Sequence, residues 1–489
     1  MASNPKVLIV GAGPVGLTLA NELTRRGISV RIVDKNAERT DKSKALVIWS
    51  RTLELFDDAG YAKEFIPAGF AAHGAQISTG KEIVANVTLD SIDSRFNYAL
   101  MIPQSESERV LEEHLAAAGV KAERRTELAG FTDKGTAVEA TLRKEDGSSE
   151  TVGADWLVGC DGAHSAVRHG LGFTFEGSTL ESHWALADGR VSGLEPKDRL
   201  HIFWHRDGIL AFFPIVGDRW RVIADLGPAA GDEKHPDPTL EEINALMALR
   251  GSPGIVMKDP FWLAAFRINE RKVKDYRKGR VFLAGDAAHI HSPAGGQGMN
   301  TGMQDAFNLA WKLGLVIEGA AKPALLDSYS PERSTVGEMV LRNAGRLTEA
   351  ATLRNPIAQG LRNTIVKFAA GFPVLQHMIA NQLSEMDIAY PDSPLTASGA
   401  YSVSGPAAGA RWPDRLPPDA GGTKFTAIGP ADAVAALATK YPRLVVAAPA
   451  VGEHAKALRL IRPDGYVGFA GAASDGVDAE AYLAVLAAG

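Results

Sequence analysis

Three short motifs carry the residues of this sequence that could do chemistry. The first is GAGPVG, in which Gly11, Gly13 and Gly16 precede a helical pattern, and Asp34 ends the next apolar run. Such glycines permit a tight turn, close approach of a pyrophosphate and close helix–strand packing, while the acid accepts ribose hydroxyls. The motif predicts a dinucleotide site. By itself it does not separate FAD from NAD(P), and a purely structural glycine turn is the alternative.

The other two motifs each place an acid in a turn after an apolar run. They are GCDGAHSAVR at 159–168, with Asp161, and GDAAH at 285–289, with Asp286. Ligands of open α/β sheets collect at the carboxyl ends of strands, although N-capping of a helix would explain either acid alone. A glycine-rich loop, HSPAGGQGMNTG, follows at 291–302. Its backbone N–H groups suit a phosphate or an electron-rich ring.

The elements that must position these motifs are recognisable from periodicity. A strand over Lys6–Val10, a helix and a second strand form one βαβ unit, and the strands before Asp161 and Asp286 return to the same layer. Alternating patterns at 71–90 and 201–226 predict antiparallel sheet, with turns at Arg206-Asp207-Gly208 and Gly217-Asp218. The period from Met303 to about Glu385 is helical, and a Pro/Gly-rich stretch precedes a small terminal α/β unit.

Composition narrows the function further. A chain of 489 residues exceeds a single core, and its net charge of -6 without dense Lys/Arg clusters indicates small-molecule partners and no nucleic acid. One cysteine, Cys160, excludes an internal disulfide and a CxxC pair and fits a cytoplasmic location. The sequence shows neither a secretion signal nor an apolar run long enough for a membrane anchor.

Taken together, GAGPVG, DGAHSAVR and GRVFLAGDAAHIHSPAGGQGMNTGMQDAFNLAWKL resemble the single-component flavin-dependent aromatic hydroxylases. The model member is para-hydroxybenzoate hydroxylase, and the most similar branch carries a C-terminal thioredoxin-like domain. That branch includes phenol hydroxylase, aromatic-polyketide hydroxylases and rifampicin monooxygenase. The resemblance implies an α/β fold with an FAD domain at 1–70, 100–175 and 270–340, and an inserted antiparallel-sheet substrate domain at 71–99 and 176–269. It also implies a helical segment at 341–403, a linker at 404–422 and a thioredoxin-like domain without redox cysteines at 423–489.

The resemblance also implies which residues bind FAD: Gly11, Gly13, Pro14, Val15, Gly16, Asp34, Lys35, Lys44, Arg51, Gln104, Asp161, Gly162, Asp286, Pro293, Gly296, Gly298, Met299 and Asn300. The aspartate at Asp161 is associated with NAD(P)H as well. Lys44 stands where the family usually has an arginine, and a lysine meets a phosphate only as a point charge. The flavin-edge loop, with Pro293, Gly295 and Gly296, is expected to border the site of oxygen transfer.

The reaction that follows from the resemblance is a hydroxylation. NAD(P)H, with NADPH as the preferred form, reduces FAD, dioxygen adds as a flavin C4a-hydroperoxide, and one oxygen passes to an activated arene. The expected partners are an aromatic or phenolic small molecule, with a polycyclic or polyketide-like compound favoured, and O2. The chain is expected to be a monomer or a homodimer.

The sequence constrains the residues that contact the substrate less than those that bind FAD. Trp204, Phe212, Phe213 and Pro214 are candidates for substrate contact, although aromatic residues in alternating strands more often fill a core. His205 is a hypothesis for a group that bonds or deprotonates a phenol, with a histidine at a surface turn as the alternative. The pair His289 and His291 has metal-ligand spacing, but no carboxylate partner for it is obvious and the family uses no metal, so we expect no metal.

Other classes remain to be weighed. A flavin-dependent halogenase shares the FAD layer, but its WxWxIP segment is not found here. Hydrolases lose support because GxSxG and HExxH are absent, and disulfide reductases are excluded by the single cysteine. A protein that keeps FAD as a structural or sensory group is the alternative from outside enzymology, and only turnover separates it from an oxygenase.

Overall fold

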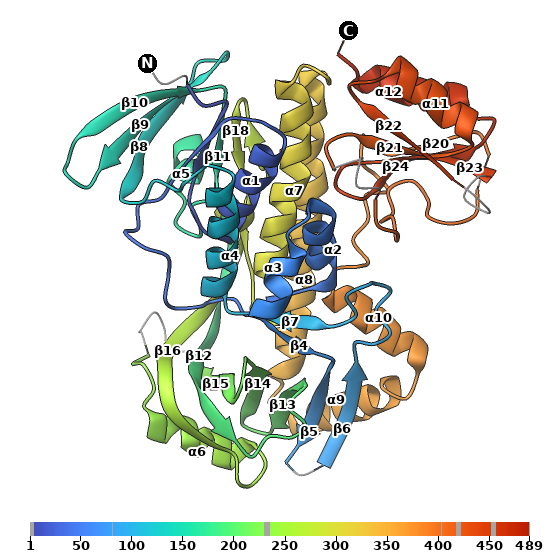
Figure 1. Cartoon of the computed structure of the whole chain (residues 1–489). Helices are drawn as coiled ribbons and strands as arrows, with labels where there is room; N and C mark the ends of the chain where they lie inside the picture. The colour runs from blue at the N-terminus through green and yellow to red at the C-terminus, as the bar shows by residue number, and fades with distance from the viewer. Residues whose placement is uncertain are drawn as a thin grey trace.

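A five-stranded sheet brings together strands that lie far apart in the sequence (Figure 1). The computed structural model describes residues 4–80, 82–228, 235–401, 403–416, 422–450 and 456–488. The order of this sheet is β17 (Arg277–Lys278), β18 (Val281–Leu283), β11 (Trp156–Gly159), β1 (Val7–Val10) and β2 (Val30–Val33). The last four are parallel neighbours, so their carboxyl ends share one edge. This confirms the expected βαβ unit and its two returning strands.

Helices cover the faces of this sheet. They include α1 (Pro14–Arg25), α4 (Gln104–Ala117), α5 (Ala166–Leu171), α7 (Gly298–Ile317) and α8 (Tyr329–Ala351). Helix α7 is buried along nearly its whole length because apolar residues occupy most of its circumference. The shorter α2 (Ser50–Ala59), α3 (Ala62–Phe65) and the turn Gly285–Ala287 complete this part.

An eight-stranded sheet forms the second layer. Its order is β19 (His289–Ile290), β16 (Val256–Lys272), β12 (Glu176–Ser192), β15 (Arg219–Pro228), β14 (Gly208–Pro214), β13 (Arg199–His205), β5 (Gly74–Thr79) and β6 (Glu82–Thr88). The hairpins β13–β14 and β14–β15 turn where the glycines predicted, and β5 pairs with β6 antiparallel. One face packs on α6 (Leu240–Arg250), and the other faces the first layer.

Two three-stranded sheets are smaller. One contains β3 (Val47–Ile48), β7 (Ala99–Met101) and β4 (Phe70–Ala72), and the other β10 (Ser149–Ala154), β9 (Val138–Lys144) and β8 (Thr126–Asp133). Two further helices, α9 (Pro356–Ala369) and α10 (Pro373–Leu383), lie beside β6 (Figure 1). No helix in the described ranges is both long and apolar enough to cross a bilayer.

The C-terminal part has a five-stranded sheet of its own. Its order is β20 (Ala397–Ser398), β24 (Val467–Ala472), β23 (Ala457–Ile461), β21 (Phe425–Gly429) and β22 (Val445–Pro449), with α11 (Ala431–Lys440) and α12 (Gly476–Leu486). From the expected linker, Trp412 and Leu416 join a buried cluster with Ile461 and Val467. Residues 417–421 of that linker lie outside the described residues.

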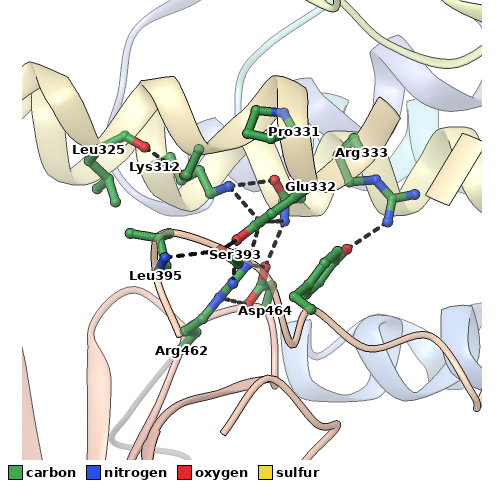
Figure 2. A network of polar contacts seen from close by, with 12 residues as sticks. Lys312, Leu325, Pro331, Glu332, Arg333, Ser393, Leu395, Arg462 and Asp464 are labelled. Carbon is green, nitrogen blue, oxygen red and sulfur yellow. Dashed lines mark hydrogen bonds and ion pairs between the residues drawn. The ribbon is translucent and has the colours of Figure 1, made fainter. Parts of the chain in front are cut away.

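A buried ionic network joins this part to the long helices. Glu332 of α8 accepts from Lys312 of α7 at 2.7 Å and from both terminal nitrogens of Arg462 at 2.7 and 2.9 Å. Figure 2 shows Arg462 and Asp464 extending toward these helices. All four side chains are at most 3% exposed. Buried charges require such pairing, so the network fixes how the C-terminal part docks.

Candidate active site

A cavity of about 750 Å³ lies at the carboxyl edge of the five-stranded sheet. Residues of all three motifs line it, as do Phe213, Arg221 and Ile223 from the eight-stranded sheet. Of the sequence-predicted residues, the lining includes Gly11, Gly13, Pro14, Val15, Asp34, Lys35, Lys44, Gln104, Asp161, Gly162, Asp286, Pro293, Gly296, Gly298 and Met299. The cavity is therefore placed where open α/β sheets bind ligands.

The first glycine turn fits a pyrophosphate. A Cβ on Gly11, whose φ is +103°, would lie 2.3 Å from the Cys160 carbonyl oxygen, and one on Gly16 would lie 1.9 Å from the Gly11 carbonyl oxygen. These two glycines are therefore required by packing. A Cβ on Gly13 would meet no protein atom within 4 Å. Gly13 thus leaves open space beside the helix, which a ligand can enter.

Two helix N-termini open into the cavity. Helix α1 begins at Pro14 after Gly13, helix α7 begins at Gly298 after Gln297, and neither start has a side-chain cap. Uncapped first-turn N–H groups and the positive end of the helix dipole attract anionic or electron-rich groups. Lys35 and Lys44 add positive charge at the same cavity, whose lining also contains acids such as Asp34 and Glu108. The wall is thus suited to a phosphate-bearing ligand with an electron-rich ring.

The acids of the motifs differ in their bonding. Asp34 accepts from the backbone N–H groups of Ala12 at 2.7 Å and Asn36 at 2.8 Å, which holds the turn. Asp161 accepts from Ser165 Oγ and from two amides at the start of α5, as the helix-capping alternative predicted. Asp286 lines the cavity, and its carboxylate accepts no hydrogen bond from the residues that the structure describes. Asp286 is therefore the motif acid most open to a ligand.

The third motif is held by Asp305. Asp305 Oδ2 accepts from the Gly285 amide at 2.9 Å and lies 3.0 Å from His289 Nε2. Asp305 Oδ1 accepts from Arg333 at 2.6 Å. All these groups are buried. Burial raises the pKa of the Asp305 carboxyl, but the Arg333 guanidinium and the contact with His289 outweigh it and hold that pKa below its ordinary value. Asp305 therefore fixes the turn that presents Asp286.

The two histidines of the HxH pair have separate partners. Their rings are stacked at 6.4 Å, and His291 Nδ1 bonds to the Ser292 carbonyl at 2.8 Å. Burial lowers the pKa of the His291 imidazole to about 4, so it is neutral at physiological pH. Within the described ranges, no three His, Cys, Asp or Glu side chains are grouped as a metal site.

The glycine-rich loop is braced by Asn300 and Trp49. Asn300 Oδ1 accepts from the Trp49 amide at 2.8 Å, and its Nδ2 donates to the carbonyls of Val47 and Gly296 at 3.0 Å. Trp49 Nε1 donates to the Gly295 carbonyl at 2.8 Å. Asn300 is fully buried and acts on the loop backbone, not on the cavity surface. Sequence reasoning missed Trp49 because no local pattern reveals a contact across about 250 residues.

The opposite wall of the cavity is stabilised by a buried ion pair. Arg221 donates to both carboxylate oxygens of Asp188, at 2.8 and 2.9 Å, and also to the Lys44 carbonyl at 3.1 Å. Neither residue was expected from the sequence. Their types alone give no signal, because charged residues in strands are usually solvent-exposed. The pair ties the eight-stranded sheet to the segment that carries Lys44.

Several predicted residues lie away from the cavity. Arg51 is buried, donates to Glu54 and to the Asp464 carbonyl, and stacks on Tyr466, so it supports the C-terminal part. Phe212 packs in the core against α6, because neighbouring residues of a strand point to opposite faces and Phe213 takes the cavity side. Pro214 is two residues after Phe212, so it belongs to the same face of the strand and is not among the lining residues.

Two more candidates lie at the far end of the hairpin. Arg362 of α9 stacks over the Trp204 ring at 4.0 Å. The His205 ring accepts from the Asp207 amide at 3.2 Å within the β13–β14 turn, and it does not line the cavity. Burial lowers the pKa of His205. The structure thus places His205 as the alternative hypothesis described it, at a turn.

Comparison with known proteins agrees with this geometry. Residues 4–344 match the model of a family described as an FAD binding domain. The chain is 38% identical to 6-methylpretetramide 4-monooxygenase of Streptomyces rimosus, over 81% of this chain and 72% of that one. It is 35% identical to pentachlorophenol 4-monooxygenase of Sphingobium chlorophenolicum, over 84% and 76%. The solved anhydrotetracycline hydroxylase of Streptomyces rimosus is similar over the full length of both chains, with 30% identity and a TM-score of 0.82.

Proposed function

Because this chain belongs to the FAD-binding-domain family and is an FAD-dependent aromatic monooxygenase, we propose that its cavity holds FAD between the α1 turn and the glycine-rich loop and accepts a multi-ring phenolic substrate. The observation that carries this assignment is the opening of two uncapped helix N-termini, α1 and α7, into one cavity. One suits a pyrophosphate, and the other suits the electron-rich side of a ring system.

FAD held in this cavity would supply the redox chemistry of the hydroxylation, in which NAD(P)H is oxidised, one atom of dioxygen enters the aromatic ring and the other leaves as water. The chain's own residues bind and orient. The backbone around Gly11 and Gly13 receives the pyrophosphate, and Lys44 offsets its charge. The Asp286 carboxylate is open to accept hydrogen bonds from the hydroxyl groups of the cofactor's sugar-like chain. The loop from Pro293 to Gly298 would present backbone N–H groups to the ring of the bound cofactor.

The substrate class rests on the lining of the far wall. The cavity of about 750 Å³ would hold FAD as well as a substrate, so its total volume does not set the size of the substrate. Phe213 and Ile223 give the sheet side an apolar surface, and Arg221 is buried below it. Relatives are named for 6-methylpretetramide and anhydrotetracycline, and one for a chlorinated phenol. An apolar wall of this kind favours a flat, multi-ring phenol over a small polar one.

The test is turnover of the FAD-loaded protein in air. NADPH and NADH oxidation are followed with single-ring phenols, naphthoquinones, tetracyclic phenols and rifamycins, and products are weighed after reaction under ¹⁸O₂. We expect faster oxidation of NADPH with a multi-ring phenol and a product that carries one ¹⁸O atom. Turnover of single-ring phenols alone would refute the substrate class. Stable FAD binding without any substrate-stimulated oxidation would favour a protein that keeps FAD for another purpose.

Two further proposals concern the reductant and the location of the protein. The reductant is expected to leave after each turnover, because the sequence holds a single GxGxxG turn. A cytoplasmic location suits the one cysteine, Cys160, which is buried and free.

A further inference from the structure

Helices α9 and α10 expose an unusual number of large apolar side chains. Nine of the 19 such residues in the described chain lie between 357 and 379. The six most exposed form what we call the α9–α10 face: Ile357 (84%), Leu361 (62%), Ile365 (56%), Phe368 (66%), Val374 (71%) and Met378 (61%). Scattered single exposures are normal on a soluble protein, but this concentration is not.

The spacing makes the exposed residues a continuous stripe. In α9 they recur every three or four residues, from Ile357 through Leu361 and Ile365 to Phe368, which is one side of a helix. Val374 and Met378 repeat the spacing in α10. The rings of Phe368 and Phe372 lie 4.6 Å apart and join the two helices. The stripe therefore runs unbroken across the turn between them.

The other side of the helix pair is already occupied. Arg362 stacks on Trp204 and donates to the Ala350 carbonyl at 2.9 Å. Lys367 pairs with Glu82 of the edge strand β6 at 3.2 Å, and His377 contacts the Ser91 carbonyl. Figure 1 shows α9 and α10 beside β6 at the end of the eight-stranded sheet. The helices are thus docked on this chain, and their apolar stripe points outward.

The area of the face matches that of a stable interface. A large apolar side chain offers roughly 200 Å² when fully exposed, so the six residues of the face present on the order of 800 Å². The largest apolar patch of a monomer is about 300 to 600 Å², and a standard interface takes about 800 Å² from each partner. The face is therefore larger than an ordinary surface patch and has the area that one partner contributes to a standard interface.

Charge decides which partner fits. Between Pro356 and Leu383 the sequence has no Asp or Glu, and its only Lys or Arg residues are Arg362 and Lys367, both engaged at the docked side. A neutral stripe can meet its own copy across a two-fold axis without like-charge repulsion. It lacks the cations that attract an anionic membrane, and the chain carries a net charge of -6. We propose that the α9–α10 face is the interface with a second copy of this chain.

The main test is the mass of the FAD-loaded full chain by sedimentation velocity over a range of concentrations. Leu361→Glu combined with Phe368→Glu places two charges on the face. The matched control, Val477→Glu with Val485→Glu, charges two residues of α12 that are 78% and 71% exposed. We expect the unaltered chain and the control to be dimers and the face variant to be a monomer with the same flavin spectrum.

Three results would overturn the proposal. They are a monomeric unaltered chain, a face variant that stays dimeric, and flotation of a monomeric chain with phosphatidylcholine–phosphatidylglycerol vesicles, which would make the face a lipid contact. If the charged variant does not fold, a milder substitution provides the test. Cys160 is buried, so Leu361→Cys supplies the one reactive thiol. Its maleimide labelling should slow as protein concentration rises, whereas that of Val477→Cys should not; equal rates would refute the interface.

Discussion

Arg221 and Asp188 form a two-pronged ion pair between β15 and β12, with both side chains 2% exposed. The third hydrogen bond of Arg221, to the Lys44 carbonyl, connects this pair to the cofactor side of the cavity. Removing one member leaves a buried, uncompensated charge, which costs far more than the pair contributes as a unit.

The first prediction therefore concerns Asp188. Asp188→Asn should lower the free energy of unfolding by about 3 to 5 kcal/mol, measured by urea denaturation. The double variant Asp188→Leu with Arg221→Met should recover most of that stability but not hydroxylation, because the bond to Lys44 is lost. A single variant as stable as the unaltered chain would show that the pair is not buried in solution.

Substitutions of two glycines in the first turn should affect FAD binding and folding separately. Gly13→Ala adds a methyl group where no protein atom lies within 4 Å, so the protein should fold normally but bind FAD about tenfold more weakly or worse. Gly16→Ala drives a Cβ to 1.9 Å from the Gly11 carbonyl oxygen and should destabilise the fold itself. Fluorescence titration of the apoprotein with FAD, beside thermal melting, distinguishes the two. Unchanged FAD affinity in Gly13→Ala would remove the pyrophosphate from this turn.

Asn300, which braces the glycine-rich loop, should control how tightly NADPH oxidation is coupled to hydroxylation of the substrate. Asn300→Ala removes two hydrogen bonds to the segment 47–49 and a third to the Gly296 carbonyl within the loop. We expect FAD to remain bound, while the product formed per NADPH consumed falls and kcat drops by roughly ten- to a hundredfold, because small displacements of reacting groups are costly. Asn86→Ala, an exposed position in β6, is the control. Full coupling in Asn300→Ala would assign Asn300 a purely structural role.

Glu385 makes stability depend on pH. Burial raises the pKa of its carboxyl to about 8, and the carboxyl accepts hydrogen bonds from Thr301 and Gln304. Between pH 4.5, its ordinary pKa, and 8 the unfolded chain releases this proton while the folded chain keeps it. This group's share of stability therefore falls by about 1.4 kcal/mol per pH unit over that window and is level above it.

Glu385→Gln tests this directly. Glutamine is neutral in both states, so its stability advantage over the unaltered chain should grow from pH 4.5 to 8 in urea denaturation. The exposed Glu241→Gln should show no such trend. An advantage that does not vary with pH would mean that Glu385 is ionised in the folded protein.

The docking network gives a fifth prediction. Burial lowers the pKa of the Lys312 ammonium to about 8 although Glu332 favours its charge. Glu332→Gln would leave Lys312 and Arg462 without their shared partner, so we expect a loss of about 3 to 5 kcal/mol and easier proteolysis of the C-terminal part. Glu338→Gln on the same helix, at an exposed pair with Arg342, should change neither. Equal protease resistance of both variants would show that other contacts hold this part in place.

Local spacing was sufficient to predict the cofactor side of the site. The glycines of the first turn and the strands before Asp161 and Asp286 have short-range signatures, and parallel strands bring their carboxyl ends to one edge. For the same reason the hairpins of the eight-stranded sheet were predictable from alternation and turn residues. These features depend on neighbours in sequence, which a reader of the sequence can see.

The rest was decided by tertiary structure. Strand register sent Phe213 to the cavity and Phe212 to the core, and a one-residue difference is invisible without knowing which face is buried. Arg51 contacts the C-terminal part, and Asp188 lies opposite Arg221 on the neighbouring strand. Contacts between residues far apart in the chain depend on how the layers stack. The sequence by itself determined the chemistry that the edge of the sheet supports, and only packing decided which side chains face it.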